Sequence, residues 1–300
     1  MRETQIIERI CQLASAGAHN RAIIRGIGDD CAIIRPRAND DLVFTSDFVL
    51  EDRHFTLETH AAADVGHKAL ARSLSDLAAM GAAPVFCLVS LAVPAALSQG
   101  WVPRFYKGLL ALAKKHKVTL AGGDLARFDK VIADVVCGGS VPRGKAILRS
   151  GAKVGDLIYV TGELGASAYG FRTQRGAAWR KHLRPEPLID AGLALRKLGV
   201  RAGMDVSDGL SLDLARLCAE SKVSANITSD LPIAPGASLE DALNGGEDYQ
   251  LLFTAPPKIK IPSLLASIPV GQIGTVSKGR PGQVLFNGRA LPPKGFDHFA

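Results

Sequence analysis

The stretch AAADVGHKALARSLSDLAAMGAAPVFCLVSLAV, residues 61–93, joins a helix pattern to a strand pattern. Its leucines recur at the i, i+4, i+7 spacing that places side chains on one helix face: Leu70, Leu74 and Leu77. This spacing predicts a helix over 61–80 that ends at Gly81 and turns its leucines toward a core. The β-rich run at 85–93 follows directly and predicts a buried strand.

The same alternation of helix and strand patterns continues on both sides of this stretch. We expect helices at 3–16, 98–116, 164–174, 187–198 and 209–221, and strands at 31–35, 41–47, 131–141, 157–161, 203–206 and 249–253. VTLAGGD (118–124) is expected to end a strand in a glycine turn. A turn at Pro142–Gly144 separates the halves, so we predict domains 1–142 and 143–300 of α/β or α+β class.

Composition restricts the class of protein further. The chain has 300 residues, a net charge of +7 and 47% hydrophobic residues, which excludes a disordered chain. The longest apolar stretch, 82–97, is interrupted by prolines and is too short to span a bilayer, and the N-terminus lacks a signal-peptide pattern. Its 5 cysteines are far apart, without a CxxC pair, so neither a zinc knuckle nor a disulfide scaffold is indicated. We expect a cytoplasmic protein with mostly buried thiols.

Acidic residues gather beside Gly, Ser or Thr, and we expect many of them at strand ends. The clusters are Gly28-Asp29-Asp30, Thr45-Ser46-Asp47, Ser75-Asp76, Gly122-Gly123-Asp124, Asp205-Val206-Ser207-Asp208-Gly209 and Gly245-Gly246-Glu247-Asp248. Carboxylates brought together in this way form the oxygen-rich cage that hard cations need, and the neighbouring glycines let backbone N–H groups approach a phosphate.

Each cluster taken alone has a simpler interpretation. A single Gly-Asp is usually a turn, Asp205-x-x-Asp208-Gly209 could be a helix N-cap, and Asp76 could be a solvated helix residue. The whole set, in a chain of net positive charge, favours a site for Mg²⁺ and phosphate. No P-loop, dinucleotide-binding GxGxxG, kinase HRD or DFG, or GxSxG pattern is present, so ATP would have to bind on a different scaffold.

Taken together, the motifs resemble the thiamine-monophosphate kinase family of the aminoimidazole-ribonucleotide-synthetase-like superfamily. The segments that carry the resemblance are GIGDDCAII (26–34), TSDFVLEDRHF (45–55), HKALARSLSDLAAMGA (67–82), AGGDLAR (121–127), RSGAKVGDLIYVTGELGASAYG (149–170), HLRPEP (182–187), MDVSDGLSLDL (204–214), GGEDYQLLFT (245–254) and GFDHF (295–299). The resemblance implies two α/β domains, with the N-terminal ATP- and Mg²⁺-binding domain joining its sheet to a partner's in a homodimer. It also implies direct in-line transfer from ATP to thiamine phosphate, with several Mg²⁺ ions, giving thiamine diphosphate and ADP.

The resemblance also assigns roles to individual residues. It implies Mg²⁺ ligands at Asp30, Thr45, Ser46, Asp47, Asp76, Asp124, Asp205 and Asp208. It implies ATP contacts at Tyr106, Gly123, Asp124, Arg149 and Ser207, and substrate contacts at His54, Glu247 and Phe296. No residue is expected to act as a general base, because the attacking phosphate is already ionised and positioning and charge remain the main tasks. Without the family context, Arg149 would be a surface residue, and His54 and Phe296 would serve packing.

The chain departs from the family pattern at a few positions. It has Asp52 where the family commonly has Gly, Ser73 where Asn is common, and Leu125-Ala126 where Thr-Thr is common. Lost hydroxyl and amide groups there could alter metal occupancy, whereas the carboxylates remain.

Two other functions stay open at this point. One is a different ATP-using synthetase of the superfamily, of the selenophosphate or aminoimidazole-ribonucleotide type, although Cys11 lacks the Gly-rich surroundings of a selenophosphate synthetase. The other is a basic nucleic-acid-binding protein, based on the net charge and on a run of basic residues around Trp179: Arg172, Arg175, Arg180, Lys181 and Arg184. A solvated helix face explains that run more simply.

Overall fold

The computed structural model describes residues 3–15, 17, 20–27, 31–97, 99–228 and 230–296. The chain divides into two compact units, residues 1–77 with 83–143, and residues 78–82 with 144–300. The first contains α1 (Glu3–Ser15), β1 (Ile23–Arg25), β2 (Ile33–Ile34), β3 (Asp40–Leu50), α2 (Ala62–Ala79), β4 (Ala83–Val93), α3 (Trp101–Lys115), β5 (Thr119–Arg127) and β6 (Ile132–Pro142), the last two residues of α2 lying beyond its limit.

The second unit contains the rest of the chain. Its elements are the 3₁₀ turn η1 (Arg149–Gly151), β7 (Leu157–Thr161), α4 (Ala166–Thr173), α5 (Gly176–Leu183), α6 (Ile189–Lys197), β8 (Ala202–Val206), α7 (Leu210–Glu220), β9 (Ser224–Ile227), α8 (Leu239–Asn244), β10 (Gln250–Ala255), β11 (Leu264–Leu265), β12 (Ile268–Ser277), β13 (Val284–Phe286) and β14 (Arg289–Leu291). No helix in the described part of the chain is long and apolar enough to cross a membrane.

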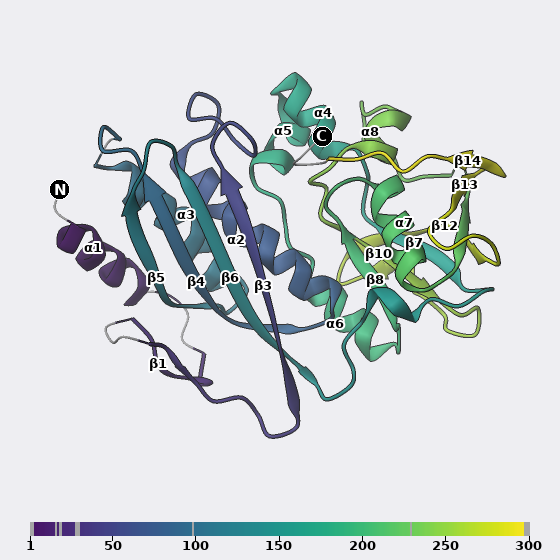
Figure 1. Ribbon diagram of the computed structural model, residues 1–300, viewed down its shortest axis with the longest axis horizontal. Helices are drawn as coiled ribbons and strands as arrows, with labels where there is room; N and C mark the ends of the chain where they lie inside the picture. Colours follow the sequence, from purple (N-terminus) through teal and green to yellow (C-terminus); the bar gives the residue numbers. More distant parts are fainter. Residues whose placement is uncertain are drawn as a thin grey trace. The chain divides into compact units, whose positions relative to one another are not determined.

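The sheet of the first unit has the strand order β3-β6-β4-β5, in which β6 runs antiparallel to β3 and β4, and β5 runs parallel to β4 (Figure 1). Alternate residues of β4 and β6 that face the helix layer, such as Val89 and Val135, are fully buried. The parallel pair needs a crossover, which α3 supplies. The leucines of α2 are fully buried as expected, and so are Lys68 and Ser75 on other sides of that helix.

Close packing of α2 on α3 depends on a glycine from each helix. A Cβ at Gly66 would lie 1.9 Å from the Phe105 carbonyl oxygen, and one at Gly108 would lie 1.9 Å from the Ala63 carbonyl oxygen. Any side chain at either position would collide with backbone. The two glycines therefore allow the backbones of α2 and α3 to lie close together.

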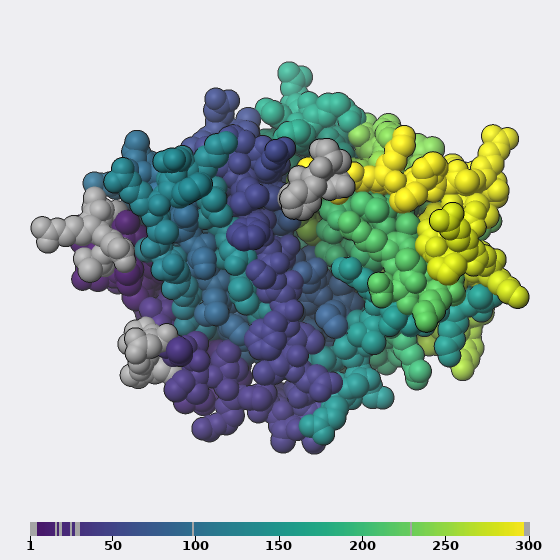
Figure 2. Space-filling model, in the orientation of Figure 1, coloured from purple at the N-terminus to yellow at the C-terminus, as the bar shows by residue number. Residues whose placement is uncertain are grey.

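The opposite face of this sheet carries exposed apolar side chains. Phe44 and Phe48 on β3 are 59% and 55% exposed, whereas the hairpin of β1 and β2 packs over Phe86 and leaves it 3% exposed. In Figure 1 the strands of this sheet lie in front of α2 and α3, so this face is turned toward the viewer there and in Figure 2, which has the same orientation. Exposed aromatic side chains on a sheet face are typical of a contact surface.

The sheet of the second unit has the order β14-β13-β9-β12-β7-β10-β8, and β11 pairs with β12. Its ladders are antiparallel except the one between β13 and β9, so this unit is of α+β type. Its core includes Ile158, Leu214 and Leu252, which are fully buried. The strand ends at β8 and β10 carry the second group of candidate site residues.

Several local expectations from the sequence are wrong. The glycines at 122 and 123 do not end a strand, because β5 continues through them to Arg127. Thr45, Ser46, Asp47 and Asp124 lie inside strands rather than at their ends. Asp76 lies inside α2, as the helix expected over 61–80 predicts. The sequence patterns also missed α5, α8, β9 and the strands after residue 260. All of these except the ten-residue β12 are short.

Candidate active site

On the helix-facing side of the first sheet, β3 and α2 bring three candidate metal ligands together. Thr45 and Asp47 alternate with exposed neighbours along β3, so both side chains face α2. Thr45 Oγ1 donates a hydrogen bond to the Asp76 carboxylate. The Arg72 guanidinium lies 3.8 Å from the Asp47 carboxylate. The arrangement is a small group of oxygen donors with one cation beside it.

A row of polar side chains crosses the opposite face of the same sheet. Ser90 on β4 is in register with Asp124 on β5 and with Asp134 on β6. Residues in register across a sheet point to the same face. Ser46 joins the row because its Oγ donates a 2.6 Å hydrogen bond to Asp134. The candidate ligands Ser46 and Asp124 therefore lie on the face opposite to Thr45 and its neighbours.

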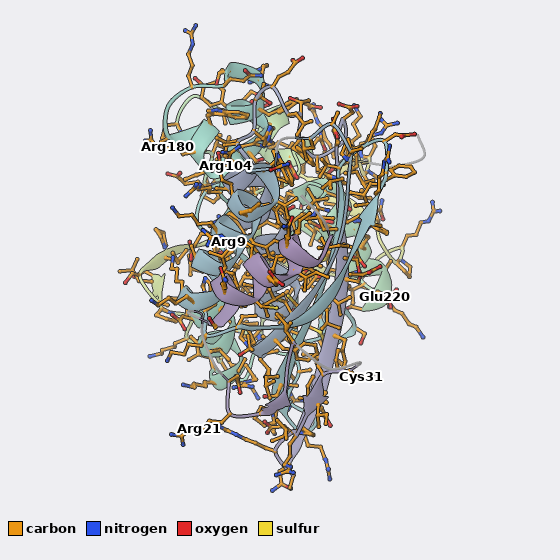
Figure 3. The ribbon with its side chains drawn as sticks, turned by 90° about the vertical axis from the view of Figure 1, so that its left-hand side faces the viewer. Arg9, Arg21, Cys31, Arg104, Arg180 and Glu220 are labelled. Carbon is orange, nitrogen blue, oxygen red and sulfur yellow. The ribbon has the colours of Figure 1, made fainter. Side chains whose placement is uncertain are left out.

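A cavity of about 650 Å³ lies against β5 and contains three of the candidate ATP contacts, Tyr106, Gly123 and Asp124. Ile7 and Ile10 of α1 supply apolar lining. Figure 3 views the molecule from the side on which α1, with the labelled Arg9, lies in front of the sheet. Apolar walls combined with a few polar groups are typical of a small-molecule or cofactor site.

Gly123 is required by the sheet itself. Its φ is +157°, and a Cβ there would lie 2.0 Å from the Val89 carbonyl oxygen. The close approach of β5 to β4 therefore explains this glycine without a ligand. It also leaves the strand without a side chain where the cavity begins.

His54 follows β3 in a tight turn and is 7% exposed. Its Nδ1 accepts a hydrogen bond of 3.0 Å from the Leu50 N–H, so the proton of the neutral ring lies on Nε2. The buried Lys68 ammonium donates to the His54 carbonyl at 3.1 Å. These bonds fix the ring as a donor through Nε2.

In the second unit, the turn between β8 and α7 is held by an acidic residue that the sequence reasoning left unassigned. Asp213 Oδ2 accepts the N–H groups of Ser207, Asp208 and Gly209 at 3.0, 3.0 and 3.1 Å. Burial raises the pKa of Asp213 to about 6. Arg216 bridges Asp213 and Asp208. The turn that carries two candidate site residues is thus fixed by three backbone bonds.

Backbone hydrogen bonds attach two further candidates to this turn. The Glu247 N–H donates to the Ser207 carbonyl at 2.7 Å, and the Phe296 N–H donates to the Asp208 carbonyl at 3.1 Å. Phe296 is 41% exposed, and Glu247 has a φ of +64°, which is uncommon outside glycine. Segments far apart in the sequence are therefore joined at one place.

The remaining candidate residues are not joined to this turn by hydrogen bonds given above. Asp205 is buried in β8, in register with Leu251. The exposed Arg149 lies beside the start of β8, where Leu148 pairs with Ala202. A strand rises about 3.3 Å per residue, so Arg149 and Ser207 lie at opposite ends of β8, separated by roughly 16 Å. Asp30 lies outside the described residues.

The candidate oxygen ligands could hold Mg²⁺ two at a time, and those that the structure describes do not form a complete set of protein ligands around one ion. Within the residues that the structure describes, no three acidic, histidine or cysteine side chains converge on one point. Mg²⁺ is commonly held by one or two carboxylates, with substrate phosphate and water completing its six oxygen ligands. The pair Thr45 and Asp76, with Asp47 beside it, has the chemistry for that mode of binding.

Sequence reasoning missed three acidic residues that organise these sites. Asp134 bonds Ser46, Asp213 holds the turn before α7, and Asp248 accepts the N–H groups of Gly165 and Ser167 at 2.5 and 2.9 Å. Asp213 and Asp248 lie inside motifs already singled out, so their positions gave a usable signal. Asp134 sits in an ordinary strand pattern and gave none.

Comparison with known proteins gives the class first. The family model of the AIR synthase related protein N-terminal domain matches residues 28–141, and that of the C-terminal domain matches residues 153–286. The chain is therefore a two-domain AIR synthase related protein.

Individual relatives narrow this class. Thiamine-monophosphate kinase of Bacillus subtilis (strain 168) is 34% identical, covering 94% of this chain and 95% of that protein. The crystal structure of thiamine-monophosphate kinase from Stenotrophomonas maltophilia K279a is 37% identical, with a TM-score of 0.84 over 97% of this chain and 98% of that one. A structure of AaThiL complexed with AMPPCP and TMP is 31% identical, with a TM-score of 0.80 over 100% and 99%. The chain belongs to the thiamine-monophosphate kinase family.

Proposed function

We propose that this protein is a Mg²⁺-dependent thiamine-monophosphate kinase, which converts ATP and thiamine phosphate to ADP and thiamine diphosphate. The geometric observation that carries the proposal is the joining of Ser207, Asp208, Glu247 and Phe296 by backbone bonds. These residues come from separate segments that the family resemblance assigned to nucleotide, metal and substrate. Thiamine-monophosphate kinases from other organisms match more than nine-tenths of the chain.

In the reaction a phosphate oxygen of thiamine phosphate attacks the γ-phosphorus of ATP. The bond from that phosphorus to the β–γ bridging oxygen breaks, and ADP leaves with the bond's electron pair. The acceptor oxygen is already ionised near neutral pH, so the protein supplies positioning and charge rather than a base.

The chain's own residues divide these tasks. Tyr106, Gly123 and Asp124 border the proposed nucleotide cavity. His54 remains a proposed substrate contact, and its Nε2 is buried inside the first unit. Bound Mg²⁺, held by the Thr45, Asp47 and Asp76 group and by the other implied ligands, would neutralise phosphate charge. Arg149 remains a proposed ATP contact, and it lies at the opposite end of β8 from Ser207. AaThiL complexed with AMPPCP, an ATP analogue, and TMP supports the choice of both substrates.

We further propose a homodimer in which the first unit's sheet joins that of a second copy. The exposed Phe44 and Phe48 side chains on the uncovered sheet face support this arrangement. A cytoplasmic location accompanies the proposal, since the five cysteines are free thiols.

The nucleic-acid alternative receives little support from the basic run. Arg172 makes two hydrogen bonds of 2.7 and 2.8 Å to Asp241, and Lys181 pairs with Glu163 at 2.8 Å. Trp179 stacks on His182 with ring centroids 5.1 Å apart. Two of the five basic side chains and the Trp179 ring therefore have partners within the protein.

The decisive experiment supplies ATP and Mg²⁺ with thiamine phosphate, and separates the products by chromatography. We expect thiamine diphosphate and ADP in equal amounts. Parallel reactions with selenide or formylglycinamidine ribonucleotide test the other synthetases of the superfamily. Failure to form thiamine diphosphate would contradict the proposal, as would salt-sensitive binding to nucleic acid without ATP turnover.

A further inference from the structure

A buried histidine that has no assigned role lies beside Glu247. His182 is the penultimate residue of α5 and is 4% exposed. Its Nδ1 lies 2.8 Å from Ser167 Oγ and 3.5 Å from Glu247 Oε2. The same ring nitrogen therefore faces a buried hydroxyl and the carboxylate of a proposed substrate contact.

Aromatic packing fixes the orientation of this imidazole. The Trp179 ring stacks on it with an interplanar angle of 11°, and the Phe171 ring lies 5.2 Å away, centroid to centroid. The stacking holds the plane of the ring, and the 2.8 Å contact between Nδ1 and Ser167 Oγ determines which edge faces Ser167. The Nδ1 edge consequently stays directed at Ser167 and Glu247.

Ser167 and Glu247 are themselves tied to one short segment. Asp248 Oδ1 accepts the Ser167 N–H at 2.9 Å, and the preceding residue, Glu247, donates its N–H to the Ser207 carbonyl. Glu247 adopts its positive φ between these two anchors. A non-glycine residue held in a sparsely populated conformation by bonds on both sides is typical of a functional site, because the backbone then determines where the side chain points.

The Glu247 side chain faces His182 on one side and is partly exposed to solvent on the other. One carboxylate oxygen faces His182, and the side chain keeps 21% of its surface exposed, which leaves room for a ligand. A separation of 3.5 Å is longer than a good hydrogen bond. When the ring carries its proton on Nδ1, this distance is short enough for the N–H dipole to attract the carboxylate. An ionised carboxylate suits the cationic ring of thiamine.

We propose that His182, supported by Ser167, is a positioning residue that acts on thiamine phosphate through Glu247. In the form of the ring that carries a proton on Nδ1, with Ser167 Oγ as an acceptor beside it, this edge keeps the Glu247 carboxylate in one orientation toward the bound thiamine group. The inference rests on the proposed function, in which Glu247 contacts this substrate. It predicts an effect on thiamine phosphate binding and none on ATP binding.

The first test compares two substitutions at His182. His182→Phe keeps an aromatic ring against Trp179 and removes Nδ1, whereas His182→Asn keeps an N–H donor near that position. We expect His182→Phe to raise the KM for thiamine phosphate about tenfold or more, with the KM for ATP changed less than twofold. His182→Asn should stay within about threefold of the original enzyme in both. Such rescue would not occur if the ring served only to fill space.

A matched control and a second variant keep the test sharp. Arg180→Gln changes an exposed residue of the same helix, labelled in Figure 3, and should leave both KM values unchanged. Ser167→Ala should shift the KM for thiamine phosphate in the same direction as His182→Phe, by a smaller factor. Thermal unfolding of each variant, alongside the parent, confirms that the compared proteins are folded.

A double-mutant comparison tests whether the effect passes through Glu247. In a Glu247→Gln background, adding His182→Phe should change the KM for thiamine phosphate less than twofold. Independent, multiplying effects would overturn the inference, as would equal changes in both KM values. If the unmodified enzyme forms no thiamine diphosphate, the proposed function fails and this inference fails with it. Turnover by that enzyme with an unaltered KM in His182→Phe refutes the inference alone.

Discussion

The carboxylates of Asp76 and Asp47 are each held in place by a neighbouring side chain. Asp76 accepts the Thr45 hydroxyl, and Asp47 lies beside Arg72, so both carboxylates are already oriented without a ligand. Orientation before binding lowers the cost of assembling a charged site. The roles of these residues in turnover can therefore be tested by changing charge without changing shape.

We expect Asp76→Asn to lower kcat at limiting Mg²⁺ by at least ~100-fold, because it removes a metal ligand's charge and keeps its volume. Asp47→Asn should behave alike. A titration of activity against Mg²⁺ measures the effect, and Asp64→Asn, earlier on the same helix, is the control that should retain activity. Parental turnover in either site variant would show that these carboxylates bind no catalytic ion.

The departures from the family pattern have local explanations. Asp52 has a φ of +65°, the backbone region that favours the family's glycine, and Lys130 pairs with its carboxylate at 2.9 Å. Ser73 is fully buried and donates a 2.8 Å hydrogen bond to the Val135 carbonyl, so this position still links α2 to β6. Leu125 and Ala126 continue β5, and nothing in the structure explains their replacement of hydroxyl residues.

Among the elements, α2 and α3 depend on mutual contact of their backbones. We expect Gly108→Ala to lower the free energy of unfolding by about 3 kcal/mol, since the new Cβ would collide with the Ala63 carbonyl. Urea unfolding measures the change. Gly271→Ala, whose Cβ would meet only the Pro232 side chain at 3.8 Å, is the matched control. Equal stability of the Gly108 variant and its parent would show that the helices can separate at little cost.

The start of α4 gives a pH prediction. Burial raises the pKa of Asp248 from 3.8 to about 6, against the opposing effect of the Ser167 and Gly165 N–H groups. Between these values the folded protein keeps a proton that the unfolded chain releases, so the Asp248 contribution to stability is present at low pH and falls as pH rises through about 6. The fall is at most about 3 kcal/mol.

Unfolding by urea across pH 4 to 7 tests this element. Asp248→Asn carries no titrating proton, so its free energy of unfolding should change less over that range than the parent's does. Its absolute stability will also differ, because an amide accepts fewer N–H bonds. Parallel pH curves for the two proteins would contradict the assignment.

For the whole molecule, the uncovered sheet face of the first unit is the feature to test. We expect the double variant Phe44→Glu and Phe48→Glu to convert the proposed dimer to a folded monomer, because charges replace apolar contact area. Sedimentation velocity measures the change in mass. Val154→Glu, at a residue that is 58% exposed in the second unit, should leave the dimer intact. A dimer that survives the double variant would place its interface elsewhere.

Local patterns in the sequence were sufficient for the elements with strong periodicity and for the family. Leucine spacing predicted α2, and glycine and acidic motifs pointed to the kinase family, because helix periodicity and short motifs are properties of neighbouring residues. The same reasoning expected a turn at Gly122-Gly123, where pairing with β4 keeps the chain extended. Short strands and α5 were missed because tertiary packing, rather than local pattern, stabilises them.

Only the tertiary structure decided which of the predicted residues meet. Strand alternation puts Ser46 and Asp47, adjacent in sequence, on opposite faces of one sheet. Hydrogen bonds between distant segments joined Ser207 to Glu247 and Asp208 to Phe296, and directed His182 to Ser167. The physical reason is that register and backbone pairing depend on residues a hundred positions away or on the other side of a sheet, whereas a sequence motif records only its own neighbours. The sequence by itself determined the family of this protein, and the fold determined which of the candidate residues lie together.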